Sequence, residues 1–69
     1  MEDYKFAVLD NNIIHTPFYE IGDCVEYANL EKIVTAIVWE QNIEKFTYWL
    51  SPTVGHSVME DELYLINRI

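Results

Sequence analysis

The chain has 69 residues, with 12 Asp and Glu against 4 Lys and Arg, which gives a formal net charge of −8 at pH 7. This length allows a single domain, and an acidic surface repels phosphate backbones, which argues against direct binding to nucleic acid. Because 51% of the residues are hydrophobic and 14% are aromatic, the chain has too much apolar surface to remain disordered.

The expected compartment is the cytoplasm. Cys24 is the only cysteine, so no internal disulfide forms and a reducing environment is indicated. The first five residues, MEDYK, lack the basic and apolar regions of a signal peptide. The longest apolar runs, such as residues 36–39, are far shorter than the roughly 20 residues of a membrane helix. We therefore expect no membrane contact.

Residues 1–17 are typical of an N-terminal β-hairpin. Residues 4–9 predict a strand and residues 13–16 a return strand, because apolar and β-branched side chains dominate both. The intervening DNN sequence of residues 10–12 favours a turn, since Asp and Asn tolerate positive φ. Pro17 then ends the pairing because it has no amide donor.

Two strands are predicted in the middle of the chain. Residues 23–27 form the first, and alternation places Asp23 and Val25 on the same face. Residues 28–32 are expected to be a polar connection. Residues 33–39, rich in β-branched side chains, predict the central strand, and their continuous apolar character indicates either two covered faces or a bulge that changes the buried side.

An amphipathic helix over residues 29–44 remains an alternative, because several apolar residues there fall at helical spacing. The β-branched run favours the strand, since these side chains lose rotamer freedom in a helix.

The C-terminal third continues the β pattern. After a loop at residues 40–45, residues 46–51 predict a strand that pairs with the central one. Residues 52–55 form a turn, residues 56–59 a short strand, and residues 60–63 a single helical turn with acids at its positive end. Residues 64–67 are the final strand.

Residues 19–66 resemble the small SH3-like barrels of the KOW and Tudor type. The residues that carry the likeness are Ile21-Gly22-Asp23-Cys24-Val25, which match the opening strand of such barrels, and Glu60-Asp61-Glu62-Leu63, which match their one-turn helix. The resemblance implies an all-β fold with one short helical turn, in which an SH3-like barrel (residues 18–69) follows the hairpin. Since this fold hosts many functions, it implies a binding module rather than a reaction.

The resemblance also bears on the aromatic residues, because in Tudor-type barrels aromatic side chains form a cage for methylated lysine or arginine. The residues at matching places are Tyr27, Trp39, Phe46, Tyr48, Trp49 and Tyr64. The other interpretation is that they form the core of a small domain.

Catalytic and metal sites are weakly indicated. Cys24 with His15 or His56 contains the residue types of a thiolate and its base, and Asp23 would complete a zinc ligand set, but no close ligand pair such as Cys-x-x-Cys occurs. Acids at residues 60–62 are explained by the helical turn that they begin. We expect no enzyme activity, no cofactor and no metal.

The expected role is a small, acidic, non-enzymatic module that binds a protein partner. Side chains alternate between the two faces of the strand predicted over residues 46–51, so if Tyr48 is buried, Trp49 points outward. Exposed tryptophans are enriched in binding hot spots. The expected contact residues are Glu26, Glu40, Glu44, Trp49, Glu60, Asp61 and Glu62.

Two other roles stay open. Carboxylates that imitate phosphates would occupy the basic groove of a DNA- or RNA-binding protein, and small acidic proteins without catalytic motifs are typical of phage or mobile-element products. Alternatively, an exposed strand edge pairs with a second copy to give a homodimer.

Overall fold

The fold is built from β-strands and one short 3-10 turn. The computed structural model describes residues 7–68. In chain order the elements are β1 (Val8–Asp10), β2 (Ile13–His15), β3 (Cys24–Tyr27), β4 (Leu30–Glu40), β5 (Lys45–Ser51), β6 (Val58–Met59), η1 (Glu60–Glu62) and β7 (Tyr64–Asn67). The predicted all-β class is confirmed. The alternative helix over residues 29–44 is wrong, because β4 fills most of this segment.

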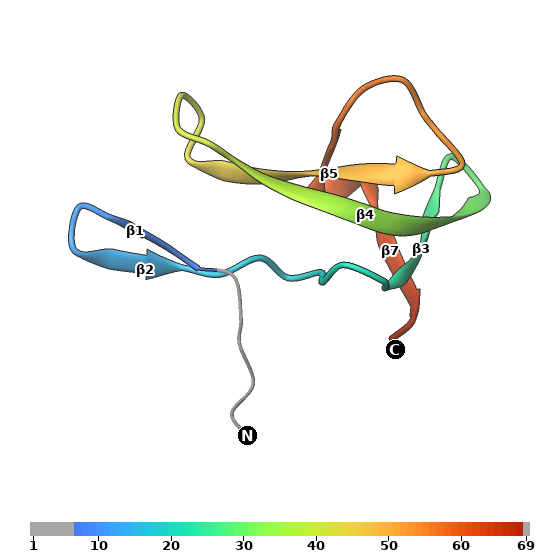
Figure 1. The fold of residues 1–69 in the computed structure, drawn as a ribbon, viewed down its shortest axis with the longest axis horizontal. Coiled ribbons are helices and arrows are strands. Elements are labelled where there is room, and N and C mark those ends of the chain that lie inside the picture. Colours follow the sequence, from blue (N-terminus) through green and yellow to red (C-terminus); the bar gives the residue numbers. More distant parts are fainter. Residues whose placement is uncertain (1–6, 69) are drawn as a thin grey trace.

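The strands form two sheets (Figure 1). β1 and β2 make an antiparallel hairpin, and the other strands form a five-stranded sheet in the order β6-β5-β4-β3-β7. β6 and β7 are therefore the two edges of this sheet, and η1 links them along the chain. In Figure 1 the hairpin lies to one side of the larger sheet and is joined to β3 by an extended linker, residues 16–23. Closure of the sheet into a barrel stays a prediction.

The N-terminal hairpin turns at Asn11 and Asn12, both at positive φ (52° and 64°). Such two-residue turns match the right-handed twist of the flanking strands. Asp10, expected in the turn, instead pairs with Ile13 as the last residue of β1. Residues 4–6 of the predicted first strand lie outside the described residues.

The β3–β4 connection is shorter than predicted. Tyr27 pairs with Leu30, so the turn consists of Ala28 and Asn29 alone, at φ 53° and 68°. The polar connection expected over residues 28–32 is wrong, because three of those residues extend β4. Ala28 is not a residue type that signals positive φ, and the sequence therefore hid the turn.

A bulge divides β4. The pairing with β5 shifts between Val34, opposite Leu50, and Ala36, opposite Trp49. Beyond the bulge Ile37 packs against the core from the same side as Val34, so the buried side moves from even to odd positions. This confirms the bulge expected from the continuous apolar run.

The core lies between the curled strands and centres on Tyr48, which is fully buried. Alternation predicts Val25 inside and Trp49 outside, and the structure confirms both. Thr47, which alternation places on the same face as Trp49, is buried instead. The other core residues are Tyr19, Val34, Phe46, Leu50, Val58 and Leu63.

The C-terminal elements follow the sequence closely. η1 and β7 occupy the predicted segments. The strand expected over residues 56–59 is paired only at Val58 and Met59.

Candidate protein-binding surfaces

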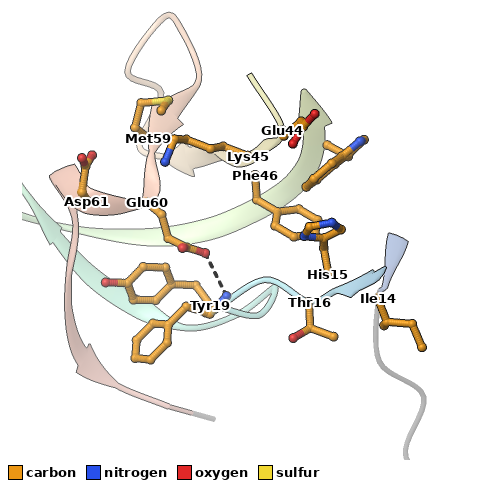
Figure 2. A pocket seen from close by; sticks show the side chains of 12 residues that line it. Ile14, His15, Thr16, Tyr19, Glu44, Lys45, Phe46, Met59, Glu60 and Asp61 are labelled. Atoms are coloured by element: carbon orange, nitrogen blue, oxygen red, sulfur yellow. Dashed lines mark hydrogen bonds between the residues drawn. The ribbon is translucent and has the colours of Figure 1, made fainter. Parts of the chain in front are cut away.

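A cleft separates the N-terminal hairpin from η1 and the start of β5 (Figure 2). Its volume is about 640 Å³. Aromatic rings form much of its wall, contributed by Phe18, Tyr19, Trp39 and Phe46. The acidic residues Glu44, Glu60 and Asp61 also line it, together with Lys45. We refer to this feature as the acidic cleft.

Ring contacts and one hydrogen-bonded glutamine hold the hairpin against the sheet. The His15 imidazole lies 4.9 Å, centroid to centroid, from the Trp39 ring, which in turn lies 4.9 Å from Phe46. Trp39 Nε1 donates to Gln41 Oε1 (2.8 Å), and Gln41 Nε2 donates to Asp10 Oδ1 (3.3 Å). One wall of the cleft is therefore built by residues of β2, the end of β4 and the start of β5.

Glu60 fixes the opposite wall. Its Oε2 accepts hydrogen bonds from the Phe18 amide (2.9 Å) and from the Tyr48 hydroxyl. The Tyr48 oxygen also accepts from the Tyr19 amide (3.4 Å). Tyr19 donates from its own hydroxyl to the Leu63 carbonyl (3.0 Å). The linker before β3 is thus tied to η1, and Figure 2 shows the Glu60 carboxylate turned toward that linker.

Burial keeps Tyr48 protonated. Desolvation raises the pKa of Tyr48 well above its ordinary value of 10.0, and the hydrogen bond to Glu60 raises it further. Desolvation also raises the pKa of Tyr19, with a further contribution from the Glu60 charge. At neutral pH both hydroxyls therefore act as hydrogen-bond donors.

A second polar cluster, formed by Asp23 and Arg68, stabilises the linker before β3. Asp23 is buried, and its Oδ2 accepts from the Glu20 amide (2.9 Å) and from Arg68 Nη1 (3.2 Å). Arg68 Nη2 donates to the Phe18 carbonyl (3.1 Å), and its guanidinium carbon lies 5.4 Å from the centre of the Phe18 ring.

The outer face of the sheet carries a different set of side chains. Trp49 on β5 is 40% exposed there, opposite Ala36. By register, Glu26 on β3 lies between Glu31 on β4 and Tyr64 on β7 on the same face. We call this surface the Trp49 face.

The predicted contact residues are divided between surfaces. Glu44, Glu60 and Asp61 line the acidic cleft, whereas Trp49 and Glu26 belong to the Trp49 face. Glu40 is paired with Lys45 where β4 ends, and Glu62 is exposed in η1.

The six aromatic residues, for which a cage and a core are the two interpretations, do not line one site. Tyr48 is enclosed in the core, while Trp49 and Tyr64 face outward. Sequence reasoning missed Phe18 and Tyr19 as wall residues of the cleft. The signal for them was the aromatic pair placed directly after the strand-ending Pro17.

The candidate catalytic and zinc residues are apart. His15 packs on Trp39, and His56 lies near Tyr27, with ring centroids 6.5 Å apart. Across residues 7–68, no three side chains of His, Cys, Asp or Glu come together as a metal-binding group.

The hairpin also exposes apolar side chains. Leu9 and Ile14 are cross-strand partners and are 69% and 70% exposed.

Comparison of the chain with protein-family models, with curated proteins and with solved structures gives no significant match. Within residues 7–68, no helix has the length and apolar character needed to cross a bilayer.

Proposed function

We propose that the protein is a non-enzymatic interaction module that binds a protein partner in the cytoplasm through the Trp49 face. The observation that supports this most is the indole of Trp49, which is 40% exposed on β5, opposite Ala36 of β4. Tryptophan combines a large apolar ring with a polar N–H, and such residues anchor many protein interfaces. A fold of this size gains stability by burying its rings, so an indole left outside is available for a partner.

The test is affinity capture from native host lysate with the wild-type protein and Trp49→Ala. We expect Trp49→Ala to lose the captured partner while keeping its circular dichroism spectrum and cooperative unfolding, because the side chain is 40% exposed. Lys32→Ala is the control and should retain the partner, because Lys32 pairs with Val25 on β3 and is not a neighbour of Trp49 in the sheet. Unfolding of Trp49→Ala would instead assign the residue to the core, and undiminished capture by a folded variant would contradict the proposal.

A nucleic-acid mimic is the second candidate function, and the charge distribution favours it. Glu31, Glu44, Asp61 and Glu62 are all exposed, and they lie on three different parts of the fold. With 12 acidic against 4 basic residues, the surface potential is negative and would attract a basic DNA- or RNA-binding protein of the kind that phage or mobile-element products inhibit.

Salt and DNA discriminate between the two functions. A mimic binds its partner with an affinity that falls steeply with salt and is displaced by competing DNA. A partner that is retained in the presence of DNA supports recognition through the Trp49 face.

A homodimer would appear as a doubled mass in light scattering at micromolar concentration, and a mass independent of concentration would rule it out.

A further inference from the structure

We propose that the acidic cleft binds an arginine side chain presented by a basic segment of a partner protein. This goes beyond the proposed function, since it concerns a different surface and names the group that is bound. The two proposals fail separately, because one depends on Trp49 and the other on Trp39 and the carboxylates across from it.

The charge of the cleft suits a cation. Glu44 and Asp61 are exposed at its rim, and Glu60 presents a carboxylate deeper in the wall. Lys45 is the opposing charge, but its cross-strand partner is Glu40, which offsets it. A positively charged group entering from solvent therefore meets an excess of carboxylates.

The rings favour a planar cation. The Nε1–H of Trp39 is already donated to Gln41, and His15 and Phe46 pack against this indole, so what Trp39 offers to a ligand is the part of its π surface that remains open to the cleft. A guanidinium group stacks on aromatic faces and is less strongly hydrated than an ammonium group. It also forms paired hydrogen bonds with a carboxylate, which a lysine cannot match in geometry.

The same recognition already occurs once within the chain. The guanidinium of Arg68 lies on the Phe18 ring, donates to the buried carboxylate of Asp23 and donates to a backbone carbonyl. The acidic cleft offers the same combination of ring and carboxylate.

The size of the cleft agrees with a side chain that belongs to a larger segment. Its volume of about 640 Å³ is within the range of roughly 300–1,000 Å³ found for ligand pockets. An arginine side chain leaves part of this space to the residues beside it.

The two tryptophans of the chain allow a direct test by NMR. The probe is a Gly/Ser peptide with one central arginine, titrated into ¹⁵N-labelled protein to about 10 mM, which covers dissociation constants in the millimolar range. We expect the indole N–H signal of Trp39 to shift and that of Trp49 to stay in place. Peptides with lysine or citrulline in place of the arginine should bind at least fivefold more weakly.

Matched variants locate the site. Asp61→Asn and Glu44→Gln should each weaken binding of the arginine peptide at least threefold. Glu26→Gln and Glu31→Gln, which remove the same charge on the Trp49 face, should leave it unchanged. Equal binding of the citrulline peptide, equal effects of both pairs of variants, or a shift confined to Trp49 would each overturn the proposal, as would no shift at all.

Discussion

Thr35 and Thr47 show how the same side chain acquires opposite roles on neighbouring strands. Thr35, at the bulge of β4, donates from Oγ1 to the Trp49 carbonyl (3.1 Å) at the surface. Thr47 on β5 is buried, and among the described residues its Oγ1 has no hydrogen-bond partner. A buried hydroxyl without a partner costs free energy because it has lost its hydrogen bonds to water.

We expect Thr47→Val to stabilise the protein by about 1 kcal/mol, because valine replaces the unpaired hydroxyl with a methyl group of similar size. Thr35→Val is the control and should be neutral or destabilising, since it removes a bond that is made. Urea denaturation of both variants measures the difference. A loss of stability in Thr47→Val would show that this hydroxyl is satisfied in solution.

Tyr48 makes stability depend on alkaline pH. Its pKa in the folded protein is raised, first by burial and then by the hydrogen bond to Glu60, whereas the pKa of an unfolded tyrosine is about 10. The folded state therefore holds its proton more tightly than the unfolded state does. The resulting stability is complete below the unfolded pKa and is lost as pH rises above it.

The free energy of unfolding should accordingly decline between pH 9.5 and 11, by about 1.4 kcal/mol for each pH unit above the unfolded pKa and for each such tyrosine. Tyr48→Phe should reduce this slope, while Tyr19, whose pKa is also raised, maintains part of it. Denaturant titrations at several pH values measure the effect. An identical slope in Tyr48→Phe would contradict the assignment.

Among the elements, the two tight hairpin turns differ in how well their residues suit them. Asn11 and Asn12 occupy the positive-φ positions of the β1–β2 turn, whereas Ala28 occupies the equivalent first position between β3 and β4. Asparagine adopts this conformation more readily than alanine does, because its short polar side chain hydrogen-bonds locally.

Ala28→Asn should therefore stabilise the protein by about 0.5–1 kcal/mol, which corresponds to an increase in Tm of a few degrees for a domain of this size. Asn11→Ala is the reciprocal variant and should lower Tm. Thermal unfolding followed by circular dichroism provides the comparison. No difference between the two variants would show that these turns do not limit stability.

The sequence predicted the elements better than it predicted the site. The β-branched run around Val34 indicated the central strand and its bulge, and alternation with the buried Tyr48 placed Trp49 outside. Ala28 concealed a turn because its type does not signal positive φ. The acidic cleft could not be found from spacing, since Phe18 and Glu60, joined by a hydrogen bond, are 42 positions apart. Only the folded chain brings them together.

On the scale of the whole molecule, charge opposes the compact state. The shortest extent of the molecule is 16 Å, which exceeds the Debye length of about 10 Å at 0.1 M salt but is shorter than the Debye length of about 30 Å at 0.01 M. Repulsion between carboxylates on opposite faces therefore acts mainly at low salt. A net charge of −8 thus produces self-repulsion that unfolding relieves. Glu26 and Glu31 add a local term, because they are direct cross-strand partners.

We expect added NaCl to stabilise the protein, with the urea midpoint rising as the salt concentration increases from about 10 mM to about 0.5 M, because the Debye length falls from about 30 Å to a few ångströms over this range. Glu31→Gln should show a smaller salt effect than Glu62→Gln, although each removes one charge. A midpoint that falls with salt would indicate that attractive pairs outweigh the repulsion.

The span of the Phe18–Glu60 contact also affects the order in which parts of the protein open. β3, β4 and β5 are joined by short turns and pair with their neighbours in sequence, whereas the linker is tied to η1 across 42 positions. Contacts of long sequence separation form late and are often lost first in partial unfolding. The Phe18 amide should therefore exchange its hydrogen with solvent faster than the Val34 amide, which is also hydrogen-bonded, to the Asp23 carbonyl (3.0 Å). A cleft that opens before the sheet does would admit and release its ligand without global unfolding.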